Sequence, residues 1–182
     1  MPASHFAIRK LAASNLGVIL LGRYTQRRDS FEKRRPSLAE EGNIEYAKQQ
    51  IAALDAHDIE SYLSRIDDSY VGHSETASGP IRGREGVRQN LQMLLTAFPD
   101  LHIEVEQIIA SGDSVVVRTR ATGTHKGNFA GIPPTNKSIE VHGCNVIELR
   151  NGKAIKGRLY SDNASLFQQL GLLSLPKATA AS

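Results

Sequence analysis

Tryptophan is absent from this 182-residue sequence, cysteine occurs once, and aromatic residues make up only 5% of the chain. So few aromatic side chains argue against a surface on which single-stranded nucleic acid would stack. The single cysteine, Cys144, excludes an intrachain disulfide and a zinc site built from several cysteines. No window approaches about 18 uninterrupted apolar residues, so we expect no membrane span.

The positive charge of the chain, +3 overall, is concentrated near the N-terminus. Residues 1–42 contain eight Lys and Arg against four Asp and Glu, whereas the rest of the chain contains 14 basic and 15 acidic residues. A nucleic-acid-binding domain would carry its positive charge on the folded part. We therefore expect no nucleic-acid partner.

The first 28 residues contain five Lys and Arg, no acidic residue, and apolar residues at helical spacing. This pattern is typical of a mitochondrial transit peptide. If residues 1–35 act as a transit peptide, the protein is mitochondrial. An extension without a targeting role, or a start codon assigned too early, would leave the protein cytoplasmic. The polar run that follows contains Pro36 and indicates a linker. We predict a basic extension and linker over 1–42, a domain over 43–175 and a tail over 176–182.

Helical spacing dominates the first half of this domain, and strand spacing dominates the second half. With Asn43 as the first N-cap, the pattern predicts helices over 44–54, 59–66, 84–98 and 163–170. Period-two alternation predicts strands at 70–71, 101–106, 115–122, 138–149 and 155–161. Helices followed by a meander of long strands predict an α+β fold, with the N-terminal helices packed on one face of a curved antiparallel or mixed sheet.

The register of the last hairpin can be predicted from its hydrophobic pattern. A two-residue loop at Asn151-Gly152 would mix apolar and charged residues on one face, whereas a three-residue loop with Gly152 in a bulge would keep one face apolar. We predict the bulged loop. It places Asn145 as a polar residue on the apolar face, and His142 opposite Asp162 on the other face.

Several motifs, in their order and spacing, resemble those of the SnoaL-like polyketide cyclase or ester cyclase family. They are AFPDL at 97–101, GD at 112–113, GTHKG at 123–127, GIPPT at 131–135, GK at 152–153, and Asp162 followed by QQLG at 168–171. The resemblance covers about residues 43–173. It implies a cone-shaped α+β barrel of the nuclear-transport-factor-2-like type, usually dimeric, with a pocket between helices and sheet. It implies no metal and no organic cofactor.

Polyketide cyclases of this family use a cavity Asp as general acid and base, with a His nearby, in an intramolecular aldol ring closure. Aligned without gaps from Gly123 to Gly171, that His falls on Asn145 and that Asp falls on Leu159. A leucine carries no proton, and an asparagine can hydrogen-bond a carbonyl or oxyanion but cannot act as a base.

Four residues form the candidate site. Asn145 would orient a carbonyl group, and His73, His125 or Asp162 would supply acid–base function. Each of the last three has a structural alternative: a solvated histidine for His73, a loop hydrogen bond for His125, and a helix cap or a pairing with His142 for Asp162. The scattered histidines give little sign of a metal site, and we predict none.

Two functions are compatible with the resemblance. In the first, the protein binds a small apolar carbonyl compound in its cone and moves a proton, as a cofactor-independent enzyme of the cyclase or isomerase type. In the second, it is a non-catalytic ligand-binding or dimeric association module that has lost the cyclase Asp/His pair. We expect a small apolar molecule as ligand and a second copy of the chain as partner.

Overall fold

The computed structural model describes residues 35–77 and 79–174, and residues from Ser37 onward form one compact unit. The helices are α3 (Leu38–Asp55), α4 (Ile59–Ser64), α5 (Gly83–Ala97) and α6 (Asn163–Leu170). The strands are β1 (Ile66–Ser74), β2 (Ile81–Arg82), β3 (His102–Ser111), β4 (Ser114–Thr124), β5 (Ser138–Arg150) and β6 (Lys153–Ser161). Residues 1–34 of the predicted extension and the predicted C-terminal tail lie outside the described residues. Residues 38–42, which the sequence assigned to the linker, form the start of α3. Within the described ranges, no helix is both long enough and apolar enough to cross a membrane.

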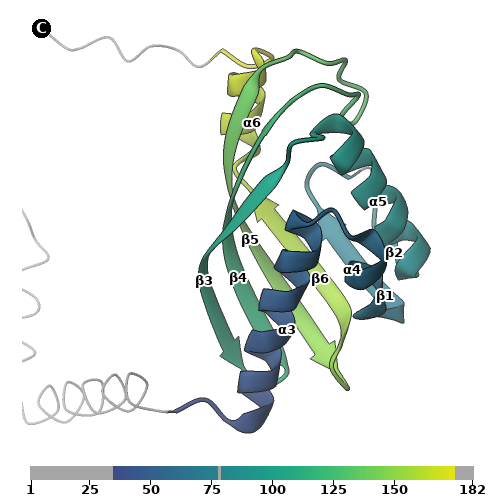
Figure 1. The fold of residues 1–182 in the computed structure, drawn as a ribbon, viewed down its shortest axis with the longest axis vertical. Helices are drawn as coiled ribbons and strands as arrows, with labels where there is room; N and C mark the ends of the chain where they lie inside the picture. The colour runs from purple at the N-terminus through teal and green to yellow at the C-terminus, as the bar shows by residue number, and fades with distance from the viewer. Residues whose placement is uncertain (1–34, 78, 175–182) are drawn as a thin grey trace, which may run out of the picture. The chain divides into compact units, whose positions relative to one another are not determined.

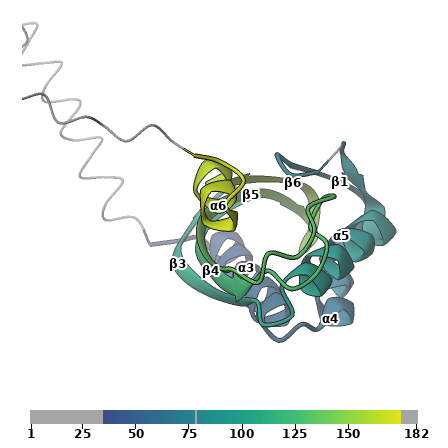
Figure 2. The same cartoon turned by 90° about the horizontal axis from the view of Figure 1, so that it is seen from above.

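The six strands form one curved sheet in the order β2-β1-β6-β5-β4-β3 (Figure 1). β1 runs parallel to β6, and the other neighbouring strands are antiparallel. Viewed from above, the sheet bends around α3 and α5, which cover its concave side (Figure 2). α3 packs on β3 and β4, α5 packs on β1, and α6 packs on the start of β5. The predicted α+β fold with helices on one face of a curved mixed sheet is confirmed. The sheet is an open cone, because β2 and β3 are free edges and the barrel does not close.

Helix α3 begins at Leu38, six residues before the predicted start, because a capping box closes its N-terminus. The backbone N–H of Glu40 donates to Ser37 Oγ at 3.3 Å, and the backbone N–H of Ser37 donates to Glu40 Oε2 at 2.8 Å. These bonds satisfy two N–H groups that a helix start would otherwise leave unpaired. The prediction of Asn43 as N-cap was therefore wrong. Asn43 lies inside the helix and donates from its side chain to the Gly112 carbonyl, at 2.9 Å.

The β5–β6 hairpin has a two-residue loop, so the predicted three-residue loop was wrong. Asn151 and Gly152 connect the paired residues Arg150 and Lys153, with φ of 53° and 72°. Asn-Gly is the pair that most readily adopts two positive φ angles in succession. The extra residue lies within β6 instead: Leu149 pairs with Ala154 and Glu148 pairs with Lys156, which leaves Ile155 as a bulge. Beyond that bulge, odd-numbered residues of β5 pair with odd-numbered residues of β6, such as Asn145 with Leu159. This register confirms the prediction that Asn145 lies on the apolar face.

The apolar core lies between the helices and the concave face of the sheet and has two parts. The first joins α3, α4 and α5 to the central strands, around Tyr46, Leu63, Ile66, Leu91 and Val115. The second joins the end of α5 and α6 to the loop between β4 and β5, and contains Phe98, Leu101, Phe129, Ile139, Val141, Leu166 and Leu170. The inner faces of β4, β5 and β6 run past both parts, so their side chains line the space between the two.

Candidate functional site

A cavity of about 220 Å³ lies between the helices and the concave face of the sheet. Most of its lining residues are apolar, and they come from every helix and from the central strands. The polar residues in its wall are few: Tyr62, Ser74, Thr76, Asn90, Thr119, Asn145, Ser161 and Asn163. An apolar cavity with a few polar groups is the usual form of a small-molecule site.

Two asparagine side chains in this wall have polar atoms that the protein does not use. Oδ1 of Asn145 and Oδ1 of Asn163 are both buried, and neither oxygen has a hydrogen-bond partner among the described residues. A buried polar group without a partner costs about 1–3 kcal/mol, so such groups are uncommon unless a ligand satisfies them. A primary amide can offer its oxygen to a hydroxyl group or, after a flip, its NH₂ to a carbonyl group.

The alternation of β5 turns Asn145 toward the cavity, as the sequence predicted. Its cross-strand neighbours are Val117 in β4 and Leu159 in β6. The two positions aligned with the cyclase His and Asp are therefore directly opposite each other, and both line the cavity. The next inward residue of β5, Gly143, pairs with Thr119 and Ser161 and leaves room between these two hydroxyl side chains.

His73 does not line the cavity. It lies in β1 next to Ser74, and because neighbouring residues of a strand face opposite sides, the cavity-lining position of Ser74 turns His73 outward. The side chain is exposed and lies opposite Arg158 of β6.

His125 is fully buried and supports the cavity wall from behind. Its ring lies 5.3 Å from the ring centre of Phe98 and 6.5 Å from that of Phe129, and these two phenylalanines line the cavity. Its Nδ1 accepts from the backbone N–H of Thr135 at 3.3 Å and lies 3.2 Å from Thr135 Oγ1. Burial lowers the pKa of His125, and a hydrogen bond with the Gly127 backbone offsets only part of that effect.

Asp162 caps helix α6. Its carboxylate accepts from the backbone N–H of Ser165 at 3.0 Å, and its own N–H donates to the His142 carbonyl at 3.1 Å. The His142 side chain turns instead to Glu106, with Nδ1 3.0 Å from Oε1. Asp162 is absent from the cavity wall.

The acid–base roles of His73, His125 and Asp162 thus stay predictions, and the geometry brings none of them together with Asn145. Among the described residues, Tyr62 is the one ionisable side chain in the cavity wall, and burial raises its pKa. In the same ranges no three His, Cys, Asp or Glu side chains gather closely enough to hold a metal ion.

An open groove of about 740 Å³ adjoins the cavity on the side of α5 and the chain between β1 and β2. Thr76, Asn90 and Met93 line both the groove and the cavity. The groove and the cavity are therefore neighbours that share part of one wall.

Sequence reasoning missed several polar residues of the wall. Thr119 and Ser161 have the same inward parity as their apolar neighbours, so the alternation could have identified them. Asn163 carries no periodic signal, because it is the first residue of α6, where the chain leaves the strand.

The comparisons with known proteins agree with this fold. A family model for SnoaL-like polyketide cyclases matches residues 45–170. IdmH, a proposed polyketide cyclase from Streptomyces antibioticus, is 30% identical over 70% of this chain and 96% of its own, with a TM-score of 0.61. A proposed SnoaL-like polyketide cyclase from Jannaschia sp. CCS1 is 22% identical over 78% and 99% of the two chains, with a TM-score of 0.71.

A protein from Catenulispora acidiphila with a ketosteroid isomerase-like fold is 16% identical over 71% of this chain and 94% of its own, with a TM-score of 0.62. No curated protein matches the chain.

Proposed function

Because the chain belongs to the SnoaL-like polyketide cyclase family, we propose that its cavity binds a small, largely apolar carbonyl compound, oriented by a hydrogen bond from Asn145. The supporting observation is the amide of Asn145, whose buried oxygen has no hydrogen-bond partner among the described residues, in a mostly apolar wall. With the amide flipped, the Asn145 NH₂ would donate to a ligand carbonyl oxygen, while the apolar body of the ligand would fill the remaining space.

The wall favours binding over the aldol ring closure of the family. Proton abstraction needs a base within hydrogen-bond reach of the substrate, and Asn145 and Leu159 occupy the two positions that would supply the cyclase pair. Asn145 can stabilise a carbonyl oxygen or an enolate oxygen by donating a hydrogen bond, but it cannot take up the proton.

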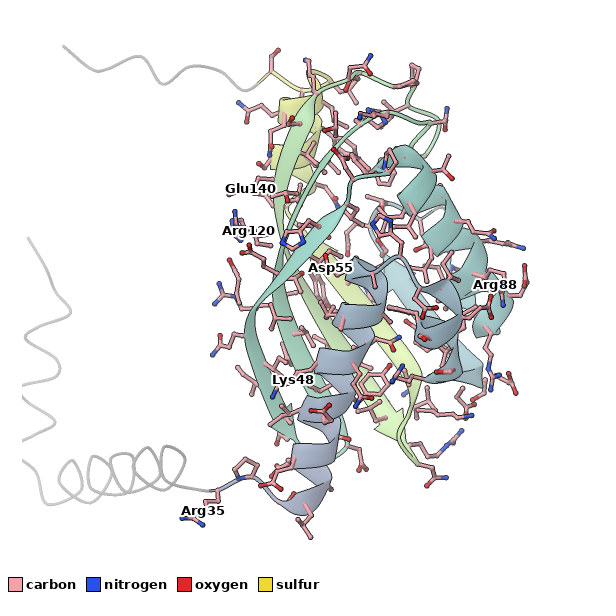
Figure 3. All side chains as sticks on the ribbon, in the orientation of Figure 1. Arg35, Lys48, Asp55, Arg88, Arg120 and Glu140 are labelled. Atoms are coloured by element: carbon pink, nitrogen blue, oxygen red, sulfur yellow. The ribbon has the colours of Figure 1, made fainter. Side chains whose placement is uncertain are left out.

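We also propose that the chain forms a homodimer through the outer face of the sheet, which no described helix covers (Figure 1). Ile109, Val116 and Val146 are cross-strand neighbours on this face, and Ile109 and Val146 are 49% and 37% exposed. On β6 the residue opposite Val146 is Arg158, and Tyr160, which is 49% exposed, lies beside it opposite Cys144. Beyond it the face is charged: Arg120 pairs with Glu104 and Glu140 (Figure 3).

The binding proposal can be tested with two bicyclic probes that differ by one oxygen, the ketone 1-tetralone and the hydrocarbon tetralin. The full chain and its Asn145→Leu variant would be titrated with each probe by calorimetry and by thermal shift. A hydrogen bond is worth about 0.5–1.5 kcal/mol, so we expect the variant to bind 1-tetralone about three- to tenfold more weakly. Its affinity for tetralin should not fall, because the substitution removes no apolar surface from the cavity wall.

The matched control is Val146→Leu, next to Asn145 on the same strand but on the outer face. It should bind both probes as the wild type does. The Asn145→Leu substitution also removes an unpartnered buried amide, so this variant should melt at or above the wild-type temperature. Equal affinities of 1-tetralone for wild type and Asn145→Leu would refute the role of Asn145, and no binding of either probe would refute the cavity as a ligand site.

A further inference from the structure

The proposed carbonyl site uses only one of the two unpartnered amides in the cavity. Asn163 is the other, and its Oδ1 is as buried and as free of protein partners as that of Asn145. The N-cap bond at this end of α6 comes from Asp162, so Asn163 is not needed to close the helix. Two buried polar groups that serve no purpose within the protein point to a ligand with two polar groups.

The positions of the two asparagines separate them along the cavity. Asn145 is level with Leu159, Ser161 is the next inward residue of the chain after Leu159, and Asn163 follows two residues later. One pair of strand residues advances about 7 Å, so Ser161 lies about 7 Å along β6 from the level of Asn145, and Asn163 lies further on, at the first residue of α6. Between them the wall is small or apolar at Gly143 and Leu159, and the hydroxyl groups of Thr119 and Ser161 flank Gly143.

The size of the cavity limits the body of such a ligand. A dry cavity of about 150 Å³ holds one benzene, and pockets for drug-sized molecules begin near about 300 Å³. At about 220 Å³ this cavity lies between the two. One or two rings fit that volume, whereas four fused rings would have to extend into the adjoining groove.

We infer that Asn163 is a second recognition residue, and that the cavity selects one- or two-ring compounds with an oxygen at each end, one on Asn145 and one on Asn163. This inference rests on the proposed binding function. It adds a residue and a ligand class: a hydroxyl or carbonyl group at both ends of a flat apolar body.

The test extends the probe series by one oxygen. 6-Hydroxy-1-tetralone carries its hydroxyl group at the end of the bicycle away from the ketone. For the wild-type full chain we expect it to bind about three- to tenfold more tightly than 1-tetralone, as one further hydrogen bond provides. In Asn163→Leu this advantage should disappear, and in the Asn145→Leu/Asn163→Leu double variant each added oxygen should weaken binding, because it would be buried without a partner.

Other outcomes would separate the inference from the function beneath it. Binding of 1-tetralone that depends on Asn145, without any gain from the second oxygen, would overturn the inference and leave the proposed function standing. Retention of the gain in a folded Asn163→Leu variant would overturn the role of Asn163. The four-ring ketone estrone binding as tightly as 6-hydroxy-1-tetralone would overturn the size limit.

Discussion

His125 shows how a single buried side chain can hold a loop in place. Nδ1 accepts a hydrogen bond from the Thr135 backbone, so the neutral ring carries its proton on Nε2. Protonation of Nδ1 would remove this acceptor and place a charge beside Phe98 and Phe129. The buried environment therefore favours neutral His125, in agreement with the direction in which burial moves its pKa.

The folding stability should fall as the pH drops below the ordinary histidine pKa. The pKa of His125 is lower in the folded protein than the ordinary histidine value of about 6.5, so acid protonates the unfolded chain first and draws the equilibrium toward it. His125 thus contributes stability in full above about pH 6.5, and the contribution is lost as the pH falls toward its folded pKa.

Urea unfolding of wild type and His125→Asn at neutral and mildly acidic pH measures this effect. The Asn variant keeps an acceptor for Thr135 but cannot take up a proton, so we expect it to be less stable at neutral pH and to lose less stability on acidification. Equal losses in the two proteins would contradict the assignment.

For single residues, the sequence predicted that Asn145 faces the cavity but did not predict that Asn163 does. Alternation along β5, anchored by apolar Val141, Ile147 and Leu149, was enough to turn Asn145 inward. The same reasoning could not place Asn163, because its direction is set by how α6 folds back over β5. His73 was assigned to the mouth of the pocket without a strand parity, and the longer β1 turns it outward.

Helix α6 depends on Asp162 as its N-cap, and Asp162 is also the carboxylate that the sequence suggested for acid–base function. Asp162→Ala removes the acceptor for the Ser165 N–H, and we expect it to cost about 1 kcal/mol of unfolding free energy. Asp162→Asn keeps an acceptor oxygen, so we expect well under half of that loss. Chemical denaturation of both variants measures the difference.

The affinity for 1-tetralone tests whether Asp162 also contributes to the binding site. Asp162 does not line the cavity, so a capping role alone predicts no change in this affinity. We expect both variants to keep the wild-type affinity. An Asp162→Asn protein that is as stable as wild type but no longer binds the ketone would contradict the capping role and return Asp162 to the site.

The order of helices and strands could be predicted from periodicity, whereas pairings between distant segments could not. The parallel contact of β1 with β6 joins segments about 90 residues apart, and only tertiary packing selects it. The early start of α3 did have a local signal, since Ser37 followed by Glu40 is a capping box, but the charged flanks indicated a linker. In the β5–β6 hairpin, the apolar pattern correctly predicted which residues face the core. The length of the loop is set instead by the Asn-Gly pair, which favours a two-residue turn.

At the scale of the whole molecule, the open cone leaves one face of the sheet without a cover. The helices fill the concave side, and the edges at β2 and β3 stay apart (Figure 2). An antiparallel sheet tolerates one solvated face when that face is polar. Here the face is charged around Arg120 but apolar around Val146, so a second copy has an apolar area to bury.

The proposed homodimer predicts a particle of twice the 19.9 kDa chain mass in sedimentation equilibrium. Val146→Glu would place an unpaired charge in the middle of the interface, and we expect the dimer dissociation constant to rise at least about tenfold, equivalent to about 1.4 kcal/mol. Leu38→Glu is the control, because Leu38 is 87% exposed but lies in α3, away from the outer face. A monomeric wild type would contradict this interface, and so would a Val146→Glu dimer as tight as the Leu38→Glu dimer. A stable interface buries about 800 Å² on each copy, so one formed by the outer face would have to include Val146.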